Sequence, residues 1–215
     1  MSKQISIIEA VSHVKSGMTV MVGGFLAVGG PNKIIDALME TDVKDLTIIC
    51  NDTTYVDRGI GKMIVAKKVK KVIVSHIGTN PETGNQINSG ELQVEFCPQG
   101  TLAERVRAGG AGLGGILTPV GLGTVIAEGK QVICVDGKDY LLEKPLRADV
   151  ALLGVSRADE AGNLFWKGDS KNFNSLMATA ADVVIAQVEE IVPTGSIAPE
   201  CVHIPFVYVN YLVKE

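Results

Sequence analysis

Apolar residues recur along this chain in two alternating patterns, one extended and one helical. Four short runs are almost continuously apolar and have the length of buried strands: residues 18–22, 46–50, 71–77 and 92–97. Residues 7–14, ahead of the first run, and residues 31–41, after it, place apolar side chains three and four positions apart, as on one helical face. Apolar strands that alternate with helices predict a largely parallel sheet covered on both faces.

Residue types at the ends of these elements indicate where the helices and turns begin and end. Ser6 and Glu9 form a capping-box pattern at the first helix, and Gly17 is placed to end it. Asp136-Gly137 lies between two strand-like runs, which predicts an antiparallel hairpin. Downstream, a helix is expected around residues 174–181, among three further apolar segments: residues 148–155, 182–188 and 204–213. We therefore expect one three-layer α/β domain over residues 1–215, with a mostly parallel sheet and a small hairpin.

Composition and charge narrow the class of protein. The chain has 215 residues, 46% of them hydrophobic and 20% charged, which are ordinary globular values. Its net charge of −4 argues against a nucleic-acid partner, which requires a basic surface. The uncharged run 108–127 contains seven glycines and Pro119, so we interpret it as loops and turns, not as a membrane span. The first residues lack the apolar core of a signal peptide, so a cytoplasmic location is expected.

The cysteines and the short motifs point away from metal chemistry. Cys50, Cys97, Cys134 and Cys201 lie far apart without a CxxC pair, which favours buried free thiols over disulfides or zinc. No HExxH or aspartate-rich pattern appears, so no metal is expected.

The sequence VGGFLAVGGP, residues 22–31, joins a predicted strand to a predicted helix. Backbone amides at such a junction point toward a bound anion, and the helix dipole favours negative charge there. The spacing matches neither GxGxxG nor a P-loop. From spacing alone, a ligand-binding loop and a tight packing turn explain these glycines equally well.

Residues 97–115, CPQGTLAERVRAGGAGLGG, end in five glycines among seven residues. Thr101 and Glu104 form a second capping-box pattern, so a helix is expected to start immediately after Gln99-Gly100, and Gly109 is placed to end it. Gln99 is thereby positioned to hydrogen-bond a bound carboxylate. The remaining glycines are too many for a helix cap, so either the backbone turns repeatedly or another molecule approaches it closely.

The polar segment 75–91 is expected to be a loop after a strand, where α/β proteins place ligand-facing residues. His76 has no serine or cysteine nucleophile pattern nearby, so we interpret it as structural. Glu82 and Glu91 are candidate carboxylates, although exposed loop acids are the simpler interpretation.

Together these stretches are more specific than each is alone. GGF followed by spaced Gly and Pro, residues 23–31, resembles the signature of family I CoA-transferases, and residues 98–115 resemble a second long block of that family. Five shorter stretches match as well: NDT at 51–53, SHIGTNPETG at 75–84, LTPVGLGT at 117–124, LLEKPLRADVAL at 141–152 and GNLFWKGDSKNFN at 162–174. The resemblance covers nearly the whole chain and is to the α subunit of the two-subunit acetate, butyrate or 3-oxoacid enzymes.

The resemblance implies an activity, a ligand and a partner. CoA, as a substrate, would move by a ping-pong mechanism between a short-chain acyl-CoA, such as acetoacetyl-CoA or butyryl-CoA, and a short-chain carboxylic acid. In this family the nucleophilic glutamate belongs to the β subunit, within a Ser-Glu-Asn-Gly motif that this sequence lacks. Glu91, in SGEL, does not fit that motif. The resemblance therefore implies an α2β2 assembly in which this chain is inactive without β.

The resemblance also assigns site residues. It places the CoA site on the glycine-rich stretch, at Gly24, Phe25, Leu26, Ala27, Val28, Gly29 and Gly30. It places Gln99 beside the reacting carboxyl group, in an orienting catalytic role. The glycines from 109 to 115 are then expected to allow close backbone approach at a shared active site or a subunit interface. Two alternatives stay open: a sugar-phosphate isomerase-type enzyme with its own acid/base set, and a non-catalytic acyl-CoA-binding protein.

Overall fold

One long, mostly parallel sheet organises the protein, whose computed structural model describes residues 3–215. The strand order is β11-β10-β8-β1-β2-β3-β4, and every neighbouring pair in this order is parallel. A short β9 pairs antiparallel with β8. The strands are β1 Thr19–Val22, β2 Leu46–Ile49, β3 Val69–Val74, β4 Gln93–Phe96, β8 Ala148–Asp159, β9 Leu164–Phe165, β10 Ala181–Val192 and β11 Tyr211–Lys214.

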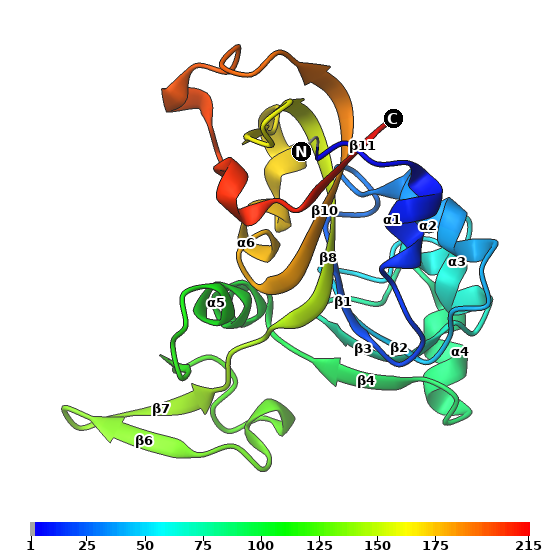
Figure 1. The fold of residues 1–215 in the computed structure, drawn as a ribbon. Coiled ribbons are helices and arrows are strands. Elements are labelled where there is room, and N and C mark those ends of the chain that lie inside the picture. Colours follow the sequence, from blue (N-terminus) through cyan, green and yellow to red (C-terminus); the bar gives the residue numbers. More distant parts are fainter. Residues whose placement is uncertain (1–2) are drawn as a thin grey trace.

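Helices cover both faces of this sheet, which confirms the expected three-layer α/β architecture. In Figure 1, α1 to α4 lie on one face, and α5 and α6 lie on the other. The helices are α1 Ile7–Ser12, α2 Asn32–Met39, α3 Ile60–Val65, α4 Pro81–Asn88, α5 Gln99–Gly110 and α6 Asn174–Met177. Short 3₁₀ turns are η1 Val125–Ala127, η2 Gly168–Lys171, η3 Pro199–Cys201 and η4 Phe206–Tyr208.

The sheet separates two apolar cores, because successive side chains of a strand point to opposite faces. In β1, Val20 and Val22 pack with Ile34, Ile35 and other residues beneath α1 to α4. Met21, between them, packs instead with the core beneath α5 and α6. Burial on both faces explains why these strands are apolar throughout.

A second, antiparallel sheet forms an arm (residues 113–143) that extends away from the main sheet (Figure 1). Its strands are β5 Ile116–Thr118, β6 Val132–Val135 and β7 Lys138–Glu143. Asp136 and Gly137 join β6 to β7 with φ values of +50° and +75°, as the hairpin prediction requires. That prediction is confirmed.

Buried ion pairs connect the arm to the body of the protein. Arg105 of α5 donates to Glu95 Oε1 of β4 (2.8 Å) and to the carbonyl oxygen of Lys144 (2.8 Å). Glu143, at the end of β7, is 2% exposed and lies 3.7 Å from Arg105 Nε and 2.5 Å from Lys130 Nζ. These pairs fix the direction in which the arm leaves α5.

Two expectations about the ends of the early elements are wrong. The segment 75–91, expected as a loop, contains α4, because Asn80 accepts from the Glu82 amide (3.2 Å) and caps a helix there. Gly17 does not end α1, which stops at Ser12. Gly17 instead adopts φ +83° and donates its amide to the Lys44 carbonyl (3.0 Å).

The capping box expected at α5 is also wrong. The helix begins at Gln99 with Pro98 at its N-cap, and no side chain caps it. The Thr101 hydroxyl is buried without a hydrogen-bond partner, and Glu104 pairs with Arg107 instead. Pro98 has a non-helical backbone (φ −52°, ψ 142°) and is the N-cap, so the helix starts two residues earlier than expected.

The expectation of four buried thiols holds for only two of them. Cys50 and Cys97 are buried, whereas Cys134 on the arm and Cys201 in η3 are exposed. All four cysteines are free.

The glycines after Gln99 are explained first by contacts within the chain. Gly109 does not end α5; the helix continues to Gly110, and Gly112 (φ +69°) provides the left-handed turn. A Cβ on Gly109 would lie 1.9 Å from the Leu146 carbonyl oxygen. One on Gly110 would lie 2.1 Å from Thr179 Oγ1. The close approach is therefore made by Leu146 and Thr179 of the same chain.

Replacing Gly109 tests this packing. At a helix position with free space around the new methyl group, Gly→Ala stabilises the fold by about 0.5–1 kcal/mol. Gly109→Ala is expected to do the opposite, lowering stability by ~2–3 kcal/mol and the Tm by about 5–10 °C, because its methyl group meets backbone. Gly100→Ala is the matched control: it lies in the same helix, and its Cβ would meet nothing within 4 Å. Equal Tm values for both variants in a thermal melt would contradict the packing argument.

The ion pairs predict how stability depends on pH. Burial alone would raise the pKa of Glu95, but hydrogen bonds from Lys71 and Arg105 outweigh it and hold that pKa below the usual glutamate value. A lowered folded-state pKa stabilises the fold above the unfolded value of about 4.3, and this contribution is lost as the pH falls further. The Tm difference between wild type and Glu95→Gln should therefore be full at pH 7 and shrink below about pH 4. Glu91→Gln, which breaks an exposed pair with Lys67, should show little difference at either pH.

Candidate functional site

The carboxyl ends of β1, β2, β3 and β4 meet at one edge of the sheet. β1 pairs with β2 on one side and with β8 on the other, so the strand order reverses beside β1. In open α/β sheets, ligands bind at this edge where the order reverses. The glycine loop (residues 23–31), between β1 and α2, lies at this position.

The tip of the glycine loop is a strained, mirror-image turn. Phe25 and Val28 exchange both backbone hydrogen bonds (3.0 and 2.9 Å). Leu26 (φ +48°) and Ala27 (φ +69°), between them, are non-glycine residues in the left-handed region. Such strain persists only where surrounding contacts enforce it, and it concentrates at functional sites. Here the Leu26 amide donates to the buried Asp52 carboxylate (2.9 Å).

Two asparagines hold the glycine loop from behind. Asn172 accepts from the Gly24 amide (3.1 Å) and donates to the Val28 carbonyl (3.2 Å), while Asn174 donates to the Gly29 carbonyl (2.8 Å). The contacts at this end of the loop are so close that a Cβ on Gly29 would lie 2.5 Å from the backbone oxygen of Ser170. Glycine is therefore needed there for packing within the chain.

The exposed surface of the glycine loop is formed by its tip. Phe25 is 48% exposed and Val28 is 57% exposed. The backbone amides of Ala27 and Gly29 donate to no acceptor in residues 3–215. The tip thus combines apolar side chains with free N–H groups, a combination suited to an anionic ligand with an apolar part.

Gln99 lies at the first position of α5, at the same edge of the sheet. Its Nε2 donates to Asn51 Oδ1 (2.5 Å), and its Oε1 accepts from the Ser75 hydroxyl. Asn51 Nδ2 in turn donates to Asp52 Oδ2 (2.7 Å). These bonds link Gln99 with the glycine loop. Gln99 Nε2 keeps a second hydrogen, which is available to a ligand oxygen.

The sequence patterns assigned no roles to Asn51, Asp52 or Ser75. Asn51 lies two residues after the end of β2 and Ser75 directly follows β3, so their position just beyond strand ends was the available signal. The expected candidates of the segment 75–91 do not reach Gln99: Glu82 accepts from Asn85 and Gln86, and Glu91 pairs with Lys67.

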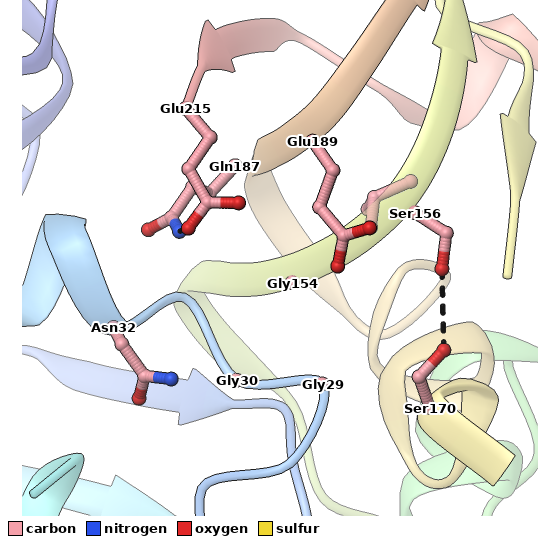
Figure 2. Close-up of a pocket in the computed structure, with 10 residues that line it drawn as sticks. Gly29, Gly30, Asn32, Gly154, Ser156, Ser170, Gln187, Glu189 and Glu215 are labelled. Carbon is pink, nitrogen blue, oxygen red and sulfur yellow. Dashed lines mark hydrogen bonds between the residues drawn. The ribbon is translucent and has the colours of Figure 1, made fainter. Parts of the chain in front are cut away.

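Two cavities flank the glycine loop and differ in charge. A cavity of about 110 Å³ is lined by Gly29 and Gly30, and Figure 2 shows Gln187, Glu189 and Glu215 across it. Its two glutamates make it acidic. On the other side, a cavity of about 440 Å³ lies between the loop tip and α3, with balanced charges: Arg58 pairs with Asp57, and Lys62 pairs with Asp36.

Neither a metal centre nor a membrane span is found in residues 3–215. No three His, Cys, Asp or Glu side chains gather in a way that would hold a metal ion. None of the helices in that range is long and apolar enough to cross a bilayer.

Known proteins identify the family. The sequence model of the family described as coenzyme A transferase matches residues 4–215. The chain belongs to the coenzyme A transferase family. Among its relatives, the acetoacetyl-CoA:acetate/butyrate CoA transferase alpha subunit of Clostridium acetobutylicum is 53% identical over 214 residues, covering 100% of this chain and 98% of that protein. The acetate CoA-transferase subunit alpha of Escherichia coli is 50% identical over 212 residues, covering 99% of this chain and 96% of that one.

Solved structures of lower identity share the fold of this CoA-transferase chain. Glutaconate coenzyme A-transferase from Acidaminococcus fermentans has a TM-score of 0.87 at 19% identity, covering 99% of this chain and 75% of that chain. The acyl-CoA transferase YdiF from E. coli O157:H7 has a TM-score of 0.86 at 23% identity. The CoA-transferase chain is fully covered but spans only 47% of YdiF. The expected fold and the resemblance to CoA-transferase α subunits are both confirmed.

Proposed function

We propose that this chain is the α subunit of a hetero-oligomeric CoA-transferase, which moves CoA between a short-chain acyl-CoA and a short-chain carboxylic acid. The observation that carries the proposal is about 50% identity, over almost the full length of both chains, to proteins named as α subunits of acetate and acetoacetyl-CoA enzymes. The expected β subunit would supply the nucleophile, since this sequence has no Ser-Glu-Asn-Gly motif.

The reaction we propose proceeds through a glutamate of the β subunit. Its carboxylate attacks the thioester carbonyl of the acyl-CoA; the C–S bond breaks, CoA leaves as the thiolate and an acyl–glutamyl anhydride remains. The thiolate then attacks the glutamyl carbonyl, which releases the first acid as a carboxylate and leaves a glutamyl-CoA thioester. A second carboxylate reverses both steps. Each addition places negative charge on a carbonyl oxygen, which hydrogen-bond donors stabilise.

Gln99 is the donor that we assign to this charge. Its amide is fixed on both sides, by Asn51 and by Ser75, so its free N–H has a defined direction. A donor that is already fixed requires no reorientation as the charge develops. Gln99 thus acts as an orienting catalytic residue.

We assign CoA to the glycine loop, at residues 24–30. The free amides of Ala27 and Gly29 suit a phosphate or a carbonyl oxygen, and the exposed Phe25 and Val28 suit an apolar part of the ligand. Glu189 and Glu215 would repel the CoA phosphates on one side of the loop. The approach along the 440 Å³ cavity, beside Arg58 and Lys62, avoids this repulsion.

The decisive experiment compares the chain alone with the chain co-expressed with a candidate β subunit. Acetoacetyl-CoA is mixed with acetate, and separately with butyrate, and the loss of the acetoacetyl-CoA enolate absorbance is followed. Activity only in the pair is the expected result. Activity of the chain alone would overturn the assignment of the nucleophile to β, and acyl-CoA binding without turnover in the pair would favour a non-catalytic binding protein.

Removing the Gln99 amide tests its role within that pair. Gln99→Ala is expected to lower kcat about 100-fold, the loss typical of one oxyanion donor, with assembly unchanged. Gln93→Ala, at an exposed position on β4, is the matched control and should keep wild-type kcat. A Gln99→Ala enzyme with normal kcat would exclude the orienting role.

We further assign the arm to the contact with β. Its segment 113–135 exposes large apolar side chains, a composition typical of protein contacts: Leu113, Leu117, Val120, Val125, Val132 and Val135. Leu117 and Val120 line a cavity of about 570 Å³ together with Gly100 of α5. Gly100 directly follows Gln99, so a subunit that delivers a carboxylate to Gln99 would also cover this cavity.

Introducing charged residues into the apolar surface of the arm should prevent assembly with the β subunit. The double variant Leu117→Asp/Val120→Asp is expected to fold but to lose co-purification with β, because an interface cannot bury the new charges. Ile8→Asp is the matched control: Ile8 is 78% exposed on α1, across the sheet from α5 (Figure 1). Undiminished co-purification of the double variant would remove the arm from the interface.

A further inference from the structure

We infer that Asn51 and Asp52 are positioning residues that couple the glycine loop to Gln99. The inference rests on the proposed function, because it assumes that the loop and Gln99 act on one substrate. It goes beyond that function by naming what sets the direction of the Gln99 amide.

Asp52 is a buried carboxylate whose hydrogen bonds come from neutral groups. It is 3% exposed. Its Oδ2 accepts from the Leu26 amide (2.9 Å) and from Asn51 Nδ2 (2.7 Å), and its Oδ1 accepts from the Thr54 amide (2.8 Å). Within residues 3–215, Asp52 has no ion pair with a lysine, arginine or histidine. A buried acid without a cation is unusual, since burial disfavours an unpaired charge.

Asp52 forms hydrogen bonds with two different parts of the candidate site. On one side, it holds the amide of Leu26, which has a strained φ of +48° at the tip of the glycine loop. On the other side, it holds the Asn51 side chain, which is 2% exposed and contacts Gln99. One carboxylate therefore connects a loop after β1 with a helix that begins after β4.

A carboxylate can only accept hydrogen bonds. This fixes which group donates and which accepts in each hydrogen bond from Asp52 through Asn51 to Gln99. Because Asp52 only accepts, Asn51 must present its Nδ2 to Asp52 and its Oδ1 to Gln99. Gln99 must then turn Nε2 toward Asn51 and Oε1 toward the Ser75 hydroxyl. The second Nε2 hydrogen is left for the substrate oxygen. With a donor in place of Asp52, the Gln99 amide would lose this enforced orientation.

The first test uses the full chain alone and needs no activity. In Asp52→Asn, the Leu26 amide should exchange with solvent at least 10-fold faster, and the Gln99 side-chain NH₂ signal should shift in an NMR spectrum. Thr53→Val is the matched control, because the neighbouring Thr53 hydroxyl is buried without a partner. It should leave both signals unchanged. A changed Leu26 amide with an unchanged Gln99 signal would overturn the coupling.

The second test is a double-mutant cycle in the assembled α/β complex. Asp52→Asn should lower kcat about 10- to 100-fold, and any rise in KM that follows from the freed Leu26 amide should be the same with and without the Gln99 amide. In a Gln99→Met background, the same substitution should lower kcat by less than about 3-fold, because Asp52 acts through an amide that is already gone. Equal factors in both backgrounds would mean that Asp52 acts independently of Gln99, and would overturn the inference.

Asn51→Ala keeps the tests decisive if Asp52→Asn does not fold. This variant leaves the bonds of Asp52 to Leu26 and Thr54 intact and releases only Gln99. Normal Leu26 exchange with a shifted Gln99 signal and a reduced kcat is expected, and an unchanged Gln99 signal would overturn the inference. If the wild-type complex transferred no CoA, the proposed function would fail, while the NMR test would still decide the coupling.

Discussion

Parallel pairing of β1 on both sides is the constraint from which the site follows. β1 runs parallel to both of its neighbours, β2 and β8. The carboxyl ends of all three strands therefore lie at the same edge of the sheet. Every loop after β1 to β4 therefore opens on the same edge. Asn51, Ser75 and Gln99, which are far apart in sequence, come within hydrogen-bond distance there because of this geometry.

The glycine loop has two kinds of residue, glycines that pack within the chain and non-glycine residues that are exposed at its tip. Its glycines face the chain itself: Gly29 lies against Ser170, and a Cβ on Gly154 of β8 would lie 2.4 Å from the Gly29 carbonyl oxygen. Its exposed tip is formed by non-glycine residues, and two of these, Leu26 and Ala27, have left-handed φ values that glycine adopts more easily. The strain at Leu26 is maintained by one hydrogen bond to Asp52, so the shape of the tip depends on a buried acid 26 positions further along the chain.

The arm and α5 form a second unit around the same edge. Arg105 anchors the arm through Glu143 and the Lys144 carbonyl, while Gln99, less than two helical turns away, faces the strand ends. A subunit that contacts the arm is thus brought close to Gln99. This arrangement fits the proposed site completed by a partner, because the sequence lacks a Ser-Glu-Asn-Gly motif and the proposed orienting residue, Gln99, lies beside the arm.

The sequence by itself determined the elements and most of their inward faces. Alternating apolar runs and helical spacing are local properties, and so is the Asp136-Gly137 turn, because each depends on residues within a few positions of one another. The family resemblance was readable in the same local stretches. The contacts of Asn51, Asp52 and Ser75 with one another and with Gln99, and the reason for Gly109 and Gly110, were decided only by the tertiary structure. Most of these contacts join residues tens of positions apart, which meet only when the strands have been ordered and the helices packed against them.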